Sequence, residues 1–263
     1  MMKALLLSLL PSAFLFSMEI GNPGQPAIQK KGVIIEEPKK WSLRLAYLDD
    51  YIYRMRFKDE FVAPPIEPSA APIFIKLTTS AGLLTLNFAN RFDFYGILGT
   101  SQIQVEREIY SKREFAWGFG GKILFARVSK VHIGFDLKYF ATLQSPLFFV
   151  SDGYAYNVLN NFRLRYSEIQ GSLGASYKTK YISPYLQLTS LISRLNPIPL
   201  TALVQYPLDS TISLDADSKP VVGQRRWGMA VGATLLGSPK ATITVESRFI
   251  NQNAIDINGE LRF

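Results

Sequence analysis

The sequence predicts an all-β fold, a transmembrane antiparallel β-barrel of about ten strands, with about twelve as the alternative. Three observations support this prediction. Apolar and polar side chains alternate with a period of two through most of the chain. Most alternating segments reach the roughly 9–11 residues that a tilted membrane-spanning strand needs. The connections between these segments are alternately long and short, as in outer-membrane barrels with short periplasmic turns and long outer loops.

Composition argues against several other classes of protein. The 263 residues include no cysteine, which excludes a disulfide scaffold and a thiolate metal site. The single histidine, His132, excludes the usual multi-histidine zinc sites. The formal net charge of +8 is spread along the chain, whereas a nucleic-acid-binding protein more often has a clustered basic stripe. Mean hydropathy is near neutral, and beyond the N-terminus no apolar window is long enough for a spanning helix.

The first 40 residues precede the alternating pattern. Residues 1–17 are predicted to be a signal peptide, because Lys3 provides a positive start and an apolar stretch follows it. Cleavage is expected after Ser17. Residues 18–40 are rich in Pro, Gly and Lys, so they are predicted to form an irregular N-terminal leader. Residues 41–263 are assigned to the outer-membrane barrel.

Five alternating segments make up the first part of this barrel. Each has one mainly apolar face, expected to meet lipid, and one polar face, expected to line the lumen. The apolar faces are Trp41, Leu43, Leu45, Tyr47, Tyr51, Tyr53, Met55 and Phe57 in residues 41–57; Leu84, Leu86 and Phe88 in 73–89; Phe92, Phe94 and Leu98 in 91–107; Phe115, Trp117, Phe119, Ile123 and Phe125 in 114–127; and Val131, Ile133, Phe135, Leu137 and Tyr139 in 130–143.

Five further segments continue the pattern to the end of the chain. Aromatic residues lie near the ends of several strands, where interfacial girdles are expected, and the last residue, Phe263, is one of them. The apolar faces are Ile169, Leu173, Ala175 and Tyr177 in residues 164–178; Ile182, Leu186 and Leu188 in 181–193; Trp227, Met229, Val231 and Leu235 in 225–236; Ile243, Val245 and Phe249 in 240–250; and Ile255, Ile257, Leu261 and Phe263 in the C-terminal segment.

Connection lengths provide a second, independent signal. The longer connections are residues 58–72, 108–113, 144–163 and 194–224. The tight ones are Asn90, Ser129, Thr179-Lys180 and Gly237-Ser238-Pro239. One outer connection, Asn251-Gln252-Asn253, is short as well. A soluble β-sandwich has no reason to alternate its loop lengths in this way, so the pattern favours a membrane barrel.

Short matches along the chain resemble the chlamydial major outer membrane protein family, which are porins. The matching segments are IGNP (20–23), LNF (86–88), NRFDFYGILG (90–99), SLGASY (172–177), SPY (183–185), LNPI (195–198), GMAVGAT (228–234), ITVESRFI (243–250) and NGELRF (258–263). The resemblance implies an outer-membrane porin that allows passive diffusion of small solutes and ions. The family is longer and cysteine-rich, so its disulfide cross-linking cannot apply to this chain.

The polar faces define the predicted pore lining. The pore-lining residues are Arg44, Arg54, Arg56, Asp93, Lys122, Asp136, Lys138, Arg226, Glu246, Arg248, Glu260 and Arg262. With Asp50 included, the inward charges comprise eight basic and five acidic residues. This excess predicts a weak preference for anions, provided that the lumen is open.

Two alternatives to a pore remain. About ten strands is intermediate between a barrel filled by side chains and one with an aqueous channel. The first alternative is therefore a structural or adhesive surface barrel with a closed lumen, with Phe148, Phe149, Tyr154 and Tyr156 contacting a partner from an outer loop. An enzyme is disfavoured, because no nucleophile–base set, phosphate loop or metal spacing is found. Neither a cofactor nor a metal is expected.

The prediction also names partners and a location. The chain is expected in the bacterial outer membrane, as a multi-pass protein in contact with outer-membrane lipid. By resemblance, Leu261 and Phe263 are expected to form an assembly signal for the barrel assembly machinery, read through the C-terminal strand. Small solutes and ions are the expected cargo. A homo-oligomer is left open, and no nucleic acid is expected.

Overall fold

The computed structural model describes residues 21–28, 33, 40–58, 73–106, 109–151, 154–159, 161–198, 201–205, 211–215, 221–236, 238 and 240–263. The predicted signal peptide, residues 1–17, lies outside the described residues, as does most of the Pro-rich connection 58–72.

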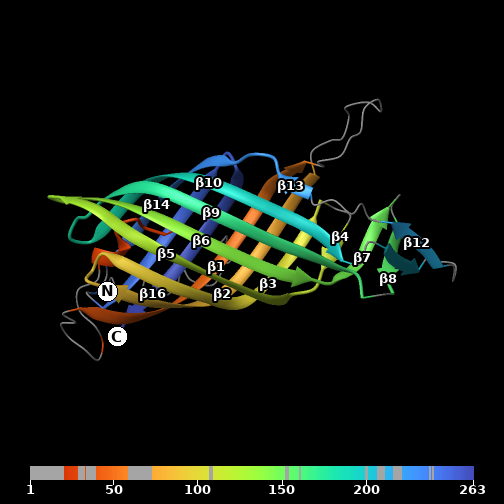
Figure 1. Ribbon diagram of the computed structural model, residues 1–263, viewed down its shortest axis with the longest axis horizontal. Helices are drawn as coiled ribbons and strands as arrows, with labels where there is room; N and C mark the ends of the chain where they lie inside the picture. The colour runs from red at the N-terminus through yellow and green to blue at the C-terminus, as the bar shows by residue number, and fades with distance from the viewer. Residues whose placement is uncertain are drawn as a thin grey trace, which may run out of the picture.

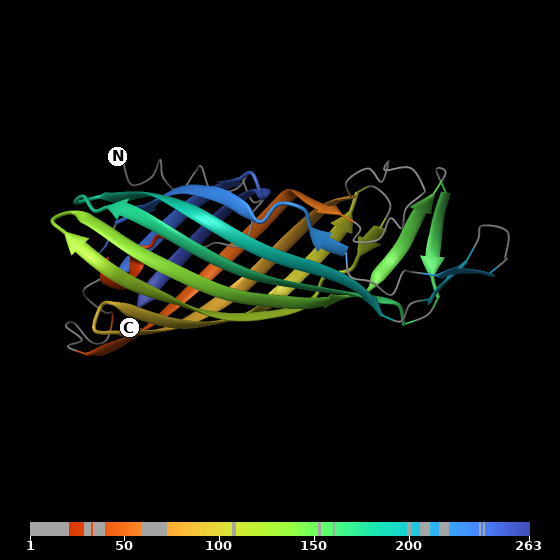
Figure 2. The ribbon, with the colours of Figure 1, turned by 45° about the horizontal axis from the view of Figure 1, so that its top comes forward.

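Ten of the described strands form a closed antiparallel ring, as the sequence predicted (Figures 1 and 2). Each strand of the ring pairs with the next one in the chain, and β1 pairs with β16 to close it. The strands are β1 (Trp41–Lys58), β2 (Ile73–Phe88), β3 (Phe92–Val105), β5 (Glu114–Val128), β6 (Val131–Gln144), β9 (Arg163–Tyr177), β10 (Ile182–Ile198), β14 (Trp227–Leu235), β15 (Ala241–Phe249) and β16 (Gln252–Arg262).

The two ends of the barrel differ. At the end that we call the turn end, tight turns join β2 to β3 and β5 to β6; positive φ angles at Ala89, Asn90 and Ser129 allow these reversals. The labelled C-terminus lies near the turn end in Figure 1. The opposite end, the loop end, bears the longer connections. By the rule for bacterial barrels, the turn end is the periplasmic end.

The loop end contains strands where the sequence predicted only long connections. A sheet continues beyond β3 through five shorter strands, which project from the barrel in Figure 2. These are β4 (Ile109–Ser111), β7 (Pro146–Ser151), β8 (Tyr154–Val158), β11 (Thr201–Gln205) and β12 (Thr211–Asp215). A further strand, β13 (Val221–Gly223), pairs with β1 and β10, which both extend past the shorter β14.

The outer surface of the barrel is apolar along most strands. Leucine, phenylalanine, tryptophan and other large apolar side chains of the predicted outward faces are exposed, among them Trp41, Leu98, Phe115 and Trp227. Such a band on a closed barrel is the surface that meets acyl chains. Among the described residues, no helix has the length and apolar character of a membrane span.

A β-bulge in β1 changes which side chains face the lumen. The pairing of β1 with both β2 and β16 shifts register just after Ile52. Met55 and Phe57 therefore point inward and are fully buried, whereas Arg54 is exposed on the outside. Its guanidinium lies 4.3 Å from the centre of the Phe74 ring. The predicted orientation of this end of the strand was thus wrong for four residues, Arg56 included.

Candidate functional site in the barrel lumen

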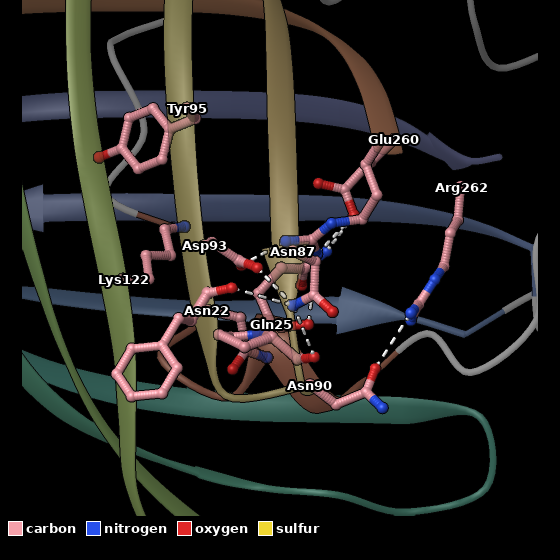
Figure 3. Close-up of polar contacts among 12 residues, drawn as sticks. Asn22, Gln25, Asn87, Asn90, Asp93, Tyr95, Lys122, Glu260 and Arg262 are labelled. Atoms are coloured by element: carbon pink, nitrogen blue, oxygen red, sulfur yellow. Dashed lines mark hydrogen bonds and ion pairs between the residues drawn. The ribbon is translucent and has the colours of Figure 1, made fainter. Parts of the chain in front are cut away.

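The half of the lumen nearer the turn end is lined with charged side chains. Arg44 of β1 forms ion pairs with Asp93 of β3 and with Glu260 of β16, the latter at 3.1 Å. Asn87 Nδ2 donates to Asp93 Oδ1 at 2.6 Å. Arg262 Nη2 donates to Asn90 Oδ1 at 3.0 Å (Figure 3). Side chains from four neighbouring strands and one turn are therefore linked across the lumen wall.

A second group of charges lies deeper in the barrel. Arg248 Nη2 of β15 is 2.8 Å from Asp50 Oδ1 of β1, and its Nε is 3.7 Å from Glu246 Oε1. Lys138 Nζ of β6 lies 3.5 Å from Glu168 Oε1 of β9. All five side chains are almost completely buried. Buried charges of this kind need partners, because an unpaired charge in a protein interior is costly.

Tyrosine hydroxyls complete these networks. Tyr166 donates to Glu168 Oε2 at 2.6 Å, and Tyr95 donates to Asp136 Oδ1 at 2.7 Å. The other oxygen of Asp136 lies 3.8 Å from Lys122 Nζ. With 14% of its side chain exposed, Lys122 is the most accessible of the basic residues in these pairs.

The half nearer the loop end is mainly apolar, apart from a buried hydrogen-bonded group of Ser101, Ser111, Thr142 and Gln144. Side chains from β1, β2, β3, β6, β9 and β10 meet there and form one contiguous cluster. Its members include Ile52, Met55, Phe57, Ile75, Leu77, Ile103, Phe140, Leu164, Leu191 and Leu195. Tyr166 joins the two halves, because its hydroxyl lies 2.6 Å from Glu168 and 3.8 Å from the Met55 sulfur. The large members of this cluster are almost completely buried, so this apolar layer occupies the interior of the loop half.

The N-terminal segment, residues 21–28, lies inside the barrel at the turn end. It includes a short 3₁₀ turn, η1 (Gln25–Ala27). All eight residues are buried, and their contacts are with the lumen wall. A cavity of about 30 Å³ lies between this segment and the wall, next to Gln25, Arg44, Asp93, Lys122 and Glu260. It has room for about one water molecule.

Most of the predicted pore-lining residues lie inside the barrel, and three do not. The interior ones are Arg44, Asp93, Lys122, Asp136, Lys138, Glu246, Arg248, Glu260 and Arg262. Arg54 and Arg56 lie outside because of the bulge, with both guanidinium groups next to the Phe74 ring. Arg226 is exposed, because β14 begins only at Trp227. The inward placement of Arg54 and Arg56 was therefore wrong, and Arg226 lies before its strand begins rather than in the lumen wall.

This correction reverses the charge balance. Glu168 and Asp256 are buried in the lumen but were missing from the sequence-based count. Both alternate in phase with predicted inward neighbours, Gln170 and Glu260, so the pattern itself could have identified them. Among the described residues, the inward charged side chains number seven acidic (Asp50, Asp93, Asp136, Glu168, Glu246, Asp256, Glu260) and six basic (Arg44, Lys122, Lys138, Lys178, Arg248, Arg262).

The aromatic residues proposed for an outer loop are placed only in part. Tyr156 is buried within the apolar cluster, so it is not a surface contact as predicted. Phe148 is half-buried and stacks on Tyr110, with ring centres 4.9 Å apart. The side chains of Phe149 and Tyr154 lie outside the described residues. Within the described part of the chain, no three His, Asp or Glu side chains are arranged as a metal site.

No protein-family model matches the chain. It is 21% identical to the major outer membrane porins of Chlamydia trachomatis serovars D and A, over the full length of both proteins in each comparison. Among solved structures, it is similar to the outer membrane protease OmpT from Escherichia coli, with 9% identity and a TM-score of 0.37 over 85% of this chain and 93% of that chain. It is also similar to the CymD monoaromatic hydrocarbon channel, with 8% identity and a TM-score of 0.28 over 94% and 93%.

The comparison with the porins extends the resemblance seen in the sequence to the whole chain, at a distant level. The barrel fold itself is established by the closed ring of paired strands. The apolar outer band and the outer-membrane relatives together identify the chain as a multi-pass outer-membrane protein.

Proposed function

We propose that this barrel is an outer-membrane porin through which small solutes and ions diffuse passively. The observation that supports this most is the full-length similarity to outer-membrane porins. The charged turn half of the lumen fits the proposal, because a polar lining can replace part of the hydration shell of a passing ion. No site chemistry is needed for passive diffusion.

Conduction requires a state other than the one described. The apolar layer around Met55, Phe57 and Phe140 fills the loop half, and the N-terminal segment occupies the turn half. Apolar constrictions in channels gate by excluding water. The proposed porin is therefore closed in this structure, and its open state must move both obstacles away from the axis.

The test is single-channel recording of the folded protein in planar lipid bilayers. The proposal expects discrete conductance steps separated by long closed periods. A heat-modifiable, fully inserted barrel that passes no current at any applied voltage would contradict it.

The ion preference follows from the corrected charge balance. The anion preference expected from the sequence depended on Arg54 and Arg56, which lie outside the lumen, and on Arg226, which is exposed before β14 begins. With seven acidic and six basic inward residues in the described part of the chain, we propose a weak preference for cations.

Reversal potentials across a salt gradient test this preference. Lys122→Glu should strengthen the selectivity for cations, because Lys122 borders the small cavity beside the N-terminal segment. Arg54→Glu is the matched control and should leave the reversal potential unchanged, since Arg54 is on the outer surface. An anion-selective wild type would contradict the proposed cation preference and support the anion preference predicted from the sequence.

A structural barrel with a permanently closed lumen is the second candidate. The apolar layer in the loop half favours it, because packed apolar side chains stabilise the wall and leave no water path. Its expected result is a folded, inserted barrel without conductance. The recordings that test the porin therefore also decide between the two candidates.

We further propose that the C-terminus acts as an assembly signal for the barrel assembly machinery. The backbone N–H of Phe263 donates to the Leu43 carbonyl at 2.8 Å, so Phe263 extends the seam between β16 and β1. Leu261 is exposed on the outer face, two residues earlier.

Deleting Phe263 should lower the folded fraction in the outer membrane by several-fold, measured by heat-modifiable migration on gels. Phe263→Tyr, which keeps an aromatic terminus, is the control and should assemble normally. Equal folding of the deletion and control variants would exclude a role for the terminal aromatic.

A further inference from the structure

We propose that the turn end of the lumen is a binding site for a short polar peptide, and that residues 21–28 of this chain are its resident ligand. The binding site is supported by the contacts between residues 21–28 and the lumen wall. Its consequence, that the bound segment closes the turn-end entrance, rests on the proposed porin function.

The lumen wall binds the backbone of the segment at both of its ends. Gln187 Nε2 donates to the Gly21 carbonyl at 2.6 Å, and the Gly21 N–H donates to Glu246 Oε2 at 3.2 Å. At the other end, Lys178 Nζ donates to the carbonyls of Ala27 and Ile28 at 3.1 and 2.9 Å. Backbone groups buried in a lumen need such partners, and the wall supplies them from side chains that point inward.

The middle of the segment is bound in the same way. Asn87 Nδ2 donates to the Pro26 carbonyl at 3.2 Å, and Arg44 Nη1 donates to the Gln25 carbonyl at 3.3 Å. Arg44 and Asn87 also bind Asp93, so the network shown in Figure 3 is shared between the wall and the segment. The charged cluster of the turn half therefore acts in part as a backbone-binding surface.

Two side chains of the segment supply sequence specificity. Asn22 Nδ2 donates to Thr234 Oγ1 at 3.0 Å and to the carbonyl and hydroxyl of Ser183, both at 3.2 Å. Gln25 Nε2 donates to Glu260 Oε1 at 2.7 Å. Asn22 is almost completely buried. Both side chains are amides, which can donate and accept at the same site.

The wall also matches the shape of the segment. A Cβ on Gly134 of β6 would lie 2.5 Å from the Pro23 carbonyl oxygen, so only glycine allows the segment to lie this close to β6. A Cβ on Gly24 would abut Ser176 Oγ and His132. Close contact on both sides distinguishes a fitted ligand from a tail that occupies leftover space.

The character of these contacts favours a segment that can leave. The segment is held by hydrogen bonds rather than by an apolar anchor in the loop-half cluster, and each such bond contributes little net free energy, because water competes for the same groups. The barrel is closed without this segment, since each of the ten strands is paired with its two neighbours. Release of residues 21–28 would thus leave a closed barrel with a hydrated turn half.

The absence of cysteine from the chain permits a direct test by an engineered disulfide. The double variant Gly24→Cys with Ser176→Cys brings the two β-carbons within bonding range, because the Gly24 Cβ position abuts the Ser176 hydroxyl. Spontaneous cross-linking in the folded barrel, seen as a reducible gel shift, is the expected result. The two single variants are controls. A folded double variant in which no cross-link forms under oxidising conditions would overturn the proposal.

Thiol accessibility measures release of the segment. Thr244 borders the small cavity next to Gln25, so Thr244→Cys reports entry of a small charged thiosulfonate reagent. Adding Asn22→Ala and Gln25→Ala should raise the labelling rate at least about tenfold, since each net hydrogen bond lost shifts an equilibrium by roughly 2- to 12-fold. Asn157→Ala, at an exposed position of β8 at the loop end, is the matched control. Unchanged labelling after both amides are removed would contradict binding through them.

A peptide added in trans separates the site from the porin function. A fluorescent peptide with the sequence of residues 21–28 should bind the Asn22→Ala, Gln25→Ala barrel, measured by anisotropy, and should slow thiol labelling when that barrel also carries Thr244→Cys. A peptide in which both amide residues are alanine should do neither. If the peptide binds but the barrel conducts neither with nor without it, the peptide-binding site is supported and the porin function is rejected. If the barrel conducts and neither the bound peptide nor the 24–176 cross-link changes the conductance, residues 21–28 do not close the entrance.

Discussion

The two halves of the lumen are built on the same strands but by opposite means. In the turn half, inward positions carry paired charges such as Arg44 with Asp93, together with the hydrogen-bonded N-terminal segment. In the loop half, the same strands turn apolar side chains inward; β1 changes from Asp50 to Ile52 within two residues. The exterior is apolar along most strands of both halves, although Arg54 and Arg56 lie on it near the loop end.

The two halves of the lumen contribute differently to stability and to function. Packed apolar side chains contribute free energy in proportion to buried area, about 25 cal/mol per Å². Buried ion pairs recover little more than their desolvation cost, so they add little net stability. We infer that the loop half provides most of the interior stability, whereas the turn half retains polar groups that a solute or a peptide can use.

The largest expected effect comes from placing a charge in the apolar half. Phe57→Asp would bury an unpaired carboxylate among apolar neighbours at a fully buried position, which costs several kcal/mol. The variant should fail to form the heat-modifiable folded band. Phe57→Leu should cost about 1–3 kcal/mol at most in urea unfolding.

A matched change in the turn half sharpens the comparison. Asn258→Asp adds a carboxylate to a lumen position that lies near polar side chains and the small cavity. It should fold, with a much smaller loss of unfolding free energy than Phe57→Asp. Equal losses in the two halves would mean that the contrast between them has no energetic basis.

The next effect concerns the deeper ion pair. Asp50→Ala leaves Arg248 buried without its partner at 2.8 Å, and breaking such a pair typically costs about 3–5 kcal/mol. Replacing both, Asp50→Ala with Arg248→Met, should cost less than Asp50→Ala alone, because Arg248 is then not left buried without Asp50, and Glu246 keeps the hydrogen bonds from Tyr185 and Gly21. A double-mutant cycle in urea checks this. An additive cycle would show that the two side chains do not interact.

The sequence predicted the ring of ten strands well because lipid imposes one rule on every strand. Outward positions must be apolar, so period-two alternation marks each strand and its outward face independently of tertiary contacts. Trp117 and Phe119 of β5 and Leu186 and Leu188 of β10 were assigned in this way, and all four are exposed on the surface. The tight turns were equally local features.

The interior was harder to predict, because its features depend on contacts distant in the chain. Met55 and Phe57 continue the alternation of apolar residues seen earlier in β1, so the sequence does not reveal the bulge. Both residues are apolar, and they can be buried in the apolar cluster of the loop half as well as in lipid. The N-terminal segment has no periodicity. Its partners lie far along the chain, as with Gln25 and Glu260, which are 235 residues apart. Only the folded ring brings these groups together.

The smallest expected effect tests the bulge itself. Arg54 and Arg248 both belong to barrel strands, but the Arg54 side chain lies on the outer surface and that of Arg248 lies in the lumen. The Arg54 guanidinium is 4.3 Å from the centre of the Phe74 ring. An exposed cation–π contact of this kind contributes about 0.5–1 kcal/mol. Arg54→Ala should therefore lower the unfolding free energy by no more than about that amount and should not alter ion selectivity. Arg248→Ala, which leaves Asp50 and Glu246 without their cation, should be several-fold more destabilising. If the two variants lost equal stability, Arg54 would have to be paired inside the lumen, and the register of β1 beyond Ile52 would follow the uninterrupted alternation instead.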